Sequence, residues 1–171
     1  SSFLNSGQIC LCGSRVLVHS SIYEEFIHKY LQGLEEFNIG PVISEQHRSK
    51  VLSYIELAKE EGGKILAGGN VPDKAGAWIE ATVIAGLSHT SRTATEEIFG
   101  PVVTVHKFDT DEEAIEMANC TQYGLAGSVW SKNRGREVAE KIESGMVWVN
   151  TWLHRDLRVP FGGVKDSGVG R

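Results

Sequence analysis

The alternation of short β-branched segments with amphipathic helical segments is the feature that most constrains the fold of this chain. The segments with strand-like patterns lie at residues 15–19, 64–67, 79–84, 101–108, 125–131 and 146–150. Segments with helical spacing follow Ser21 and occupy residues 44–61, 110–118 and 133–143. Strands that alternate with helices of this length need crossover connections. We therefore expect an α/β fold, with an open, mainly parallel sheet and helices on both faces.

Two segments carry a helix-start pattern. Ser21 and Thr110 are each followed three residues later by a glutamate, Glu24 and Glu113. A hydroxyl residue and a glutamate at this spacing form a capping box, in which each side chain binds a backbone N–H group of the first turn. We expect a helix to begin at each of these positions.

Composition limits the class of protein. A chain of 171 residues can bury a hydrophobic core as one domain, and its 41% hydrophobic and 23% charged residues are typical of a soluble globular protein. The net charge of -5 and the lack of a basic stripe argue against a nucleic acid partner. Apolar runs such as residues 146–149 are too short to span a bilayer, so no membrane partner is expected.

Cysteine usage indicates the compartment. The chain has three cysteines, an odd number that argues against a disulfide framework and favours a reducing environment. The polar residues that precede Cys10 do not resemble a signal peptide. We expect a cytoplasmic protein.

Cys10 allows three interpretations from the residues alone. It could pack unreactively, as most cysteines do; it could pair with Cys12 at a metal; or it could be a nucleophile. Metal binding is disfavoured, because no second Cys or His pair stands at zinc spacing, and no metal is expected. The turn at residues 5–8 can present backbone N–H groups near Cys10, which a reactive thiolate requires.

Three blocks of sequence resemble a known family. They are FxNxGQxC at residues 3–10, EEIFGPV at 96–102 and the glycine-rich PFGGxKxSGxGR at 160–171. These blocks are similar to the signatures of the aldehyde dehydrogenase superfamily, in that family's order. Residues 123–131 and 145–150 also resemble it, so the resemblance covers nearly the whole chain.

The resemblance implies a reaction at Cys10. In this family the cysteine attacks an aldehyde to form a thiohemiacetal, a hydride passes to NAD⁺ or, as the alternative cofactor, NADP⁺, and water hydrolyses the resulting thioester. The backbone N–H of the nucleophile is one donor to the oxyanion. The expected partner is therefore a small-molecule aldehyde substrate.

The resemblance also implies two cofactor-binding residues. Glu97 matches the carboxylate that binds the nicotinamide-ribose hydroxyls, and Phe99 matches the aromatic residue beside that ribose. Without the resemblance, Glu96 and Glu97 would both be assigned as solvated loop acids and Phe99 as a core residue. Lys50 matches a position near the adenosine ribose in some members, although a solvated lysine is the alternative.

The segment at residues 151–160, which we call the arginine loop, differs from many family members. It carries His154, Arg155 and Arg158 where apolar or aromatic residues are common, and Phe161 follows at the pocket aromatic. WLxR in this loop and ICLC around Cys10 most resemble the 2-aminomuconate and 2-hydroxymuconate semialdehyde dehydrogenases. We expect Arg155, or else Arg158, to bind a substrate carboxylate. The alternative is a surface ion cluster of Arg155, Asp156 and Arg158.

The family's chains are longer than this one. Their dinucleotide-binding domain, general-base glutamate and oxyanion asparagine have no counterpart in residues 1–171, nor does the C-terminal strand used in subunit association. We expect residues 1–171 to be the catalytic domain of an enzyme that forms a homo-oligomer, present as a fragment. The alternatives are a truncated relative that binds or assembles without redox turnover, and a weak esterase that uses Cys10 alone.

Overall fold

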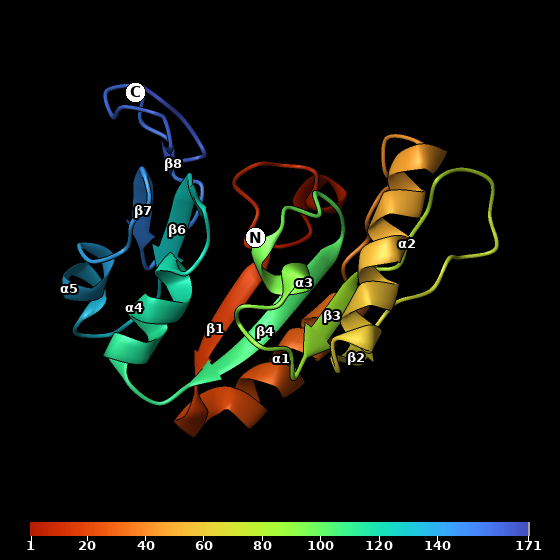
Figure 1. Cartoon of the computed structure of the whole chain (residues 1–171), viewed down its shortest axis with the longest axis horizontal. Helices are drawn as coiled ribbons and strands as arrows, with labels where there is room; N and C mark the ends of the chain where they lie inside the picture. Colours follow the sequence, from red (N-terminus) through yellow and green to blue (C-terminus); the bar gives the residue numbers. More distant parts are fainter. Residues whose placement is uncertain (171) are drawn as a thin grey trace. The chain divides into compact units, whose positions relative to one another are not determined.

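The computed structural model describes residues 1–170, and the contacts between Cα atoms divide the chain into two compact units. The first unit is Ser1–Asp109 and the second is Thr110–Arg171. Each unit has its own sheets and helices (Figure 1).

The first unit contains a four-stranded sheet in the order β1-β4-β3-β2. Its strands are β1 (Arg15–His19), β2 (Lys64–Ala67), β3 (Thr82–Ala85) and β4 (Val102–Phe108). β4 pairs in parallel with both β1 and β3, and β2 is antiparallel to β3. β3 and most of β4 are buried along their length, as expected for strands covered on both faces. The predicted mainly parallel sheet is confirmed.

Two helices cover opposite faces of this sheet. α1 (Tyr23–Glu35) contributes Phe26 to a hydrophobic cluster that contains Val83 of β3, and α2 (Glu45–Glu60) contributes Val51 and Ile55 to a separate cluster that contains Ile84. Because successive side chains of a strand point to opposite faces, Val83 and Ile84 belong to different sides of the sheet. The prediction of helices on both faces is confirmed.

The two predicted helix starts have different outcomes. Thr110 caps α4 (Asp111–Asn119), since its side chain accepts a hydrogen bond from the N–H of Glu113. The prediction for Ser21 is wrong. α1 begins two residues later, after a 3₁₀ turn, η2 (Ser20–Ile22), and the side chain of His19 accepts the hydrogen bond from the N–H of Ser21.

The second unit contains two small sheets. β6 (Ala126–Val129) and β7 (Met146–Val149) are parallel, and β5 (Tyr123–Gly124) and β8 (Val164–Lys165) are antiparallel. α5 (Gly135–Ala139), between β6 and β7, is shorter than predicted. After Ala139 the chain continues in turns with hydrogen bonds between residues three apart: the N–H of Lys141 donates to the carbonyl of Val138, and the N–H of Ile142 donates to that of Ala139.

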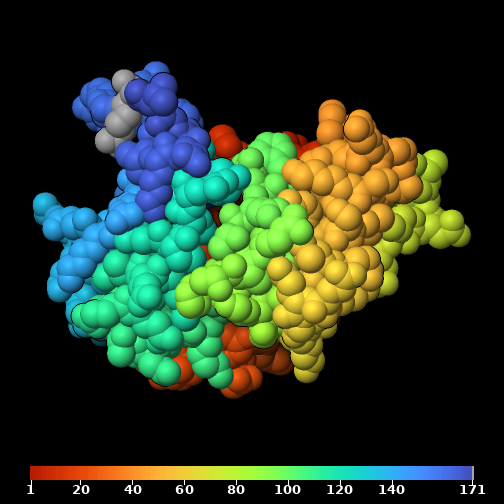
Figure 2. Space-filling view, viewed as in Figure 1, coloured from red at the N-terminus to blue at the C-terminus, as the bar shows by residue number. Residues whose placement is uncertain are grey.

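The segment between β2 and β3 has no helix or strand over residues 68–76, as its glycine-rich sequence predicts. It projects beyond α2 (Figure 2). No helix among residues 1–170 is both long enough and apolar enough to cross a membrane.

Candidate active site

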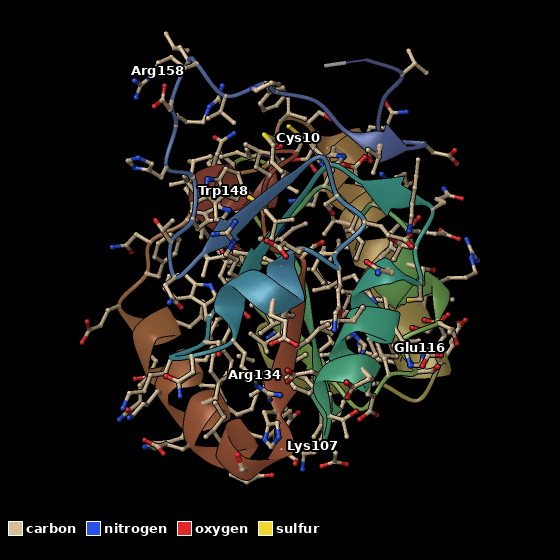
Figure 3. The ribbon with its side chains drawn as sticks, turned by 90° about the vertical axis from the view of Figure 1, so that its left-hand side faces the viewer. Cys10, Lys107, Glu116, Arg134, Trp148 and Arg158 are labelled. Carbon is tan, nitrogen blue, oxygen red and sulfur yellow. The ribbon has the colours of Figure 1, made fainter. Side chains whose placement is uncertain are left out.

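Cys10 is exposed in the loop that leads into β1 (Figure 3). This loop contains the short 3₁₀ element η1 (Leu4–Gly7), in which Asn5, Ser6 and Gly7 all adopt positive φ values of 50°, 56° and 73°. The N–H of Gln8 donates to the carbonyl of Asn5 at 3.1 Å, and the side-chain amide of Asn5 donates to the carbonyl of Gln8 at 3.2 Å. Asparagine and glycine tolerate this left-handed backbone better than other residues, which explains their place in the turn.

The loop of residues 5–12, which we call the cysteine loop, is bound to the segment that precedes α2. The hydroxyl of Ser6 donates to the carbonyl of Gly40 at 2.8 Å, and the side-chain oxygen of Gln8 accepts from the N–H of Ile43 at 2.9 Å. Gly7 is also buried against the backbone, since a Cβ atom at this position would lie 2.0 Å from the carbonyl oxygen of Gly100. Contacts from residues distant in sequence thus hold the loop around Cys10.

Cys10 and Cys12 have different environments. Cys10 is exposed, whereas Cys12 is partly buried with its Sγ 3.6 Å from the carbonyl oxygen of Leu4. Burial raises the pKa of the Cys12 thiol, so its thiolate is poorly populated near neutral pH. Cys10 is therefore the more accessible thiol of the pair. Among residues 1–170 no group of three or more His, Cys, Asp or Glu side chains could hold a metal ion.

The two adjacent glutamates, Glu96 and Glu97, also have different environments. The Glu96 carboxylate accepts hydrogen bonds from Arg92 Nε at 2.7 Å and from the Tyr54 hydroxyl at 2.6 Å, and these contacts lower its pKa. Glu97 is exposed, and within residues 1–170 its carboxylate forms neither a hydrogen bond nor an ion pair. Of these two glutamates, Glu97 is therefore the one whose carboxylate is available for a ligand in residues 1–170.

Phe99 is 37% exposed, whereas its neighbour Ile98 is buried in the core at 6%. The interpretation of Phe99 as a core residue is therefore wrong, because Ile98 occupies that place. The backbone of Phe99 has a positive φ of 59°, and the carbonyl oxygen of Phe99 lies 2.7 Å from Nε2 of His47. Lys50 Nζ donates to the carbonyl oxygen of Glu97 at 3.1 Å, so this lysine contacts the segment that was expected to bind the cofactor.

The arginine loop lies in the second unit and follows β7. The indole N–H of Trp148 donates to the carbonyl of His154 at 3.0 Å, which fixes the start of the loop (Figure 3). Arg158 binds Asp156 through Nε and Nη2, with a closest distance of 2.6 Å, and these hydrogen bonds lower the pKa of the Asp156 carboxyl. The surface ion cluster thus forms between Asp156 and Arg158.

Arg155 has a different contact. Its guanidinium carbon lies 4.9 Å from the centre of the Phe161 ring, a cation–π geometry. In the described part of the chain Arg155 has no carboxylate partner. The five predicted site residues therefore lie in two groups: Cys10, Glu97 and Phe99 in the first unit, and Arg155 with Phe161 in the second.

The sequence did not predict the contact of His47 with Phe99, and it predicted Gln8 only as part of the turn at residues 5–8. The side chain of Gln8 also reaches the N–H of Ile43, which comes 35 residues later. Serine is a preferred helix cap, so Ser44 indicates that His47 lies on the first turn of α2. No local pattern indicated its partner.

An α/β fold with an exposed cysteine on a tightly bound loop is consistent with the class of protein that the sequence blocks indicate. The model of the aldehyde dehydrogenase family matches residues 1–171, and the chain belongs to this family. The predicted family membership is confirmed.

Two curated relatives are similar over the whole chain. The chain is 48% identical to a 2-aminomuconic 6-semialdehyde dehydrogenase of Pseudomonas sp. and 44% identical to the 2-hydroxymuconic semialdehyde dehydrogenase of Pseudomonas sp. strain CF600. These alignments cover 99% and 100% of this chain but 38% and 39% of the relatives. The chain therefore spans about two fifths of their length.

A solved structure confirms the predicted fold. The betaine aldehyde dehydrogenase from Staphylococcus aureus, crystallised in complex with NAD⁺, matches with a TM-score of 0.95 at 41% identity. The match covers 99% of this chain and 37% of that chain.

Proposed function

We propose that this chain is the catalytic domain of a longer NAD⁺-dependent aldehyde dehydrogenase and that its substrate is a semialdehyde carrying a carboxylate. The observation that carries the proposal is the exposed thiol of Cys10 on a loop fixed by Ser6, Gly7 and Gln8. A nucleophile needs this combination, because the thiol must be accessible while its backbone stays in place.

The Cys10 thiolate attacks the aldehyde carbon, and the carbonyl electron pair moves to the oxygen. Within residues 1–170 the backbone N–H of Cys10 has no acceptor, so it is available to donate to this oxyanion. Loss of a hydride from the same carbon leaves the acyl group on Cys10 as a thioester, which water hydrolyses to the acid. The thiol suits this step because it is a strong nucleophile and also a good leaving group.

The segment of residues 96–100 fits a nicotinamide dinucleotide. The carboxylate of Glu97, which has no partner among residues 1–170, is a suitable acceptor for two ribose hydroxyls, and the exposed ring of Phe99 offers an apolar surface. NAD⁺, when bound, supplies the hydride acceptor. The NAD⁺ complex of the similar betaine aldehyde dehydrogenase supports this choice of cofactor.

Arg155 is proposed to bind the substrate carboxylate. Arg158 already pairs with Asp156, whereas the Arg155 guanidinium has no carboxylate partner in the described residues and lies over the ring of Phe161. The two curated relatives are named for muconic semialdehydes, molecules that carry a carboxylate as well as an aldehyde. A planar guanidinium binds such a carboxylate through two parallel hydrogen bonds.

Kinetics on the whole protein test this assignment. Arg155→Ala should raise KM for a carboxylated semialdehyde about tenfold or more, because a charge-assisted hydrogen bond contributes about 1.5–3 kcal/mol. The KM for a neutral aliphatic aldehyde should hardly change. Arg158→Ala is the matched control and should leave both values near wild type. Equal losses on both substrates in Arg155→Ala would contradict the assignment.

For the whole protein we further propose a cytoplasmic location and a homo-oligomeric state. The three cysteines are all free thiols in the structure, which suits a reducing compartment. Light scattering on the whole protein measures the oligomeric state, and a monomeric mass would contradict this part of the proposal.

A further inference from the structure

His47 lies on the first turn of α2 and contacts the backbone of the proposed cofactor segment. Its Nε2 atom is 2.7 Å from the carbonyl oxygen of Phe99. Because a carbonyl only accepts, Nε2 must carry the hydrogen. The two rings also meet edge to face, with centroids 6.5 Å apart. Lys50, one turn further along the same helix, donates to the carbonyl of Glu97, so α2 binds two carbonyls of this segment.

The backbone at Phe99 needs such support. A positive φ of 59° is uncommon for a bulky side chain, and a conformation of this kind persists only where its surroundings hold it. On one side Gly100 packs against Val51 of α2, where an added Cβ would lie 2.5 Å from a Val51 methyl group. The hydrogen bond from His47 holds the peptide group between Phe99 and Gly100 in its orientation.

The same end of α2 also contacts the cysteine loop. The N–H of Ile43, just before the helix, donates to the side chain of Gln8, and Ser44 caps the helix by accepting from the N–H of His47 at 3.1 Å. One helix end therefore touches both the loop that carries Cys10 and the segment that carries Glu97 and Phe99.

We propose that His47 is a positioning residue for the dinucleotide: its imidazole holds the Phe99 carbonyl and so fixes the turn that presents Phe99 and Glu97. The proposal rests on the cofactor role proposed above for Glu97 and Phe99. His47 acts through the backbone of Phe99.

The test uses three variants of the whole protein that contains this chain. His47→Leu removes the donor, His47→Gln keeps a side-chain N–H donor, and Gln46→Leu places leucine at the neighbouring exposed position on the same helical turn. The readouts are KM for NAD⁺, KM for the aldehyde, and the Kd for NADH from its fluorescence, which needs no turnover. Melting temperatures show whether each variant is folded.

His47→Leu should raise KM for NAD⁺ and Kd for NADH about fivefold, the factor expected from losing one neutral hydrogen bond. KM for the aldehyde should stay at the wild-type value. His47→Gln should restore both nucleotide values, and Gln46→Leu should match wild type. The proposal is overturned if His47→Leu binds NADH normally, or if a folded His47→Gln is as defective as the leucine variant.

A further pair of variants separates this inference from the proposed function. Glu97→Gln and Phe99→Leu should both weaken NADH binding if the segment contacts the dinucleotide. If both of these variants weaken NADH binding and His47→Leu does not, only the proposed role of His47 is wrong. If neither variant changes NADH binding, the proposed cofactor role of the segment is wrong, and the role of His47 with it.

Discussion

Gly7 is the residue on which the geometry of the cysteine loop depends most directly. Its φ of 73° lies in the left-handed region, and its Cα faces the backbone carbonyl of Gly100 with no space for a side chain. The atom that a Cβ at residue 7 would meet belongs to the backbone, so the collision cannot be relieved by a change of side-chain rotamer. This contact places the cysteine loop directly against the segment of Glu97 and Phe99.

Gly7→Ala should lower the free energy of unfolding by about 3 kcal/mol, from the left-handed backbone and the collision with Gly100. Gly62→Ala is the matched control, because Gly62 has a φ of 85° but nothing within 4 Å of an added Cβ. It should lose only about 1 kcal/mol. Urea denaturation measures both values, and equal losses would contradict the role of the Gly100 contact.

Adjacent residues of the same type can have unlike environments, as Glu96 and Glu97 illustrate. Glu96 is bound by Arg92, one helical turn before it, and by Tyr54 on α2. Glu97 is exposed, and in residues 1–170 its carboxylate has neither a hydrogen bond nor an ion pair. The chemical difference between the two acids thus comes from contacts that the local sequence does not show.

At the scale of elements, α2 supports both parts of the proposed site in the first unit. Its apolar side packs on the sheet through Val51 and Ile55, and its first turn contacts the 96–100 segment. The helical spacing predicted this helix over residues 44–61, which agrees with the observed Glu45–Glu60 to within one residue at each end. α1 was predicted with the wrong cap. The N–H of Ser21 donates to the side chain of His19 in a 3₁₀ turn, and α1 begins only at Tyr23.

The cap of α4 allows a direct test of an element. Thr110→Ala should lower the free energy of unfolding by about 1 kcal/mol, because the N–H of Glu113 loses its acceptor. Thr110→Ser keeps the hydroxyl and should remain close to wild type. Ser21→Ala should cost less than about 0.5 kcal/mol, since Ser21 caps no helix. A loss at Ser21 as large as that at Thr110 would contradict the corrected start of α1.

At the scale of the molecule, the buried side chain of His106 on β4 links the stability of the chain to pH. Burial, and to a smaller extent the charges of Arg15 and His89, lower the pKa of His106 to about 4 from its ordinary value of 6.5. The folded state therefore favours the neutral imidazole. Protonation favours the unfolded state as pH falls through 6.5, and this effect ends near pH 4, where folded His106 also takes up a proton.

The contribution of His106 should be about 3 kcal/mol of stability at neutral pH, lost between pH 6.5 and 4. The measurement is the free energy of unfolding from urea curves across this pH range. His106→Gln removes the titrating group, so its profile should be flatter than that of wild type, whatever its absolute stability. Parallel profiles would show that His106 does not cause the dependence.

The sequence by itself determined the α/β class, the family, the positions of most strands and the identity of the candidate nucleophile. Periodicity and signature blocks are local properties, so they can be recognised along the chain without knowledge of contacts. β2 was predicted with its observed bounds, whereas β3 begins three residues later than predicted, at Thr82.

Only the tertiary structure decided which members of each similar pair are available for chemistry. In the described part of the chain, Glu96 is paired and Glu97 is not, Arg158 is paired while Arg155 lies over Phe161, and Cys10 is exposed while Cys12 is partly buried. Some of the deciding partners, such as Tyr54 for Glu96 and His47 for Phe99, come from distant parts of the sequence. Such contacts form only when the chain folds, because packing brings together groups that no local pattern relates.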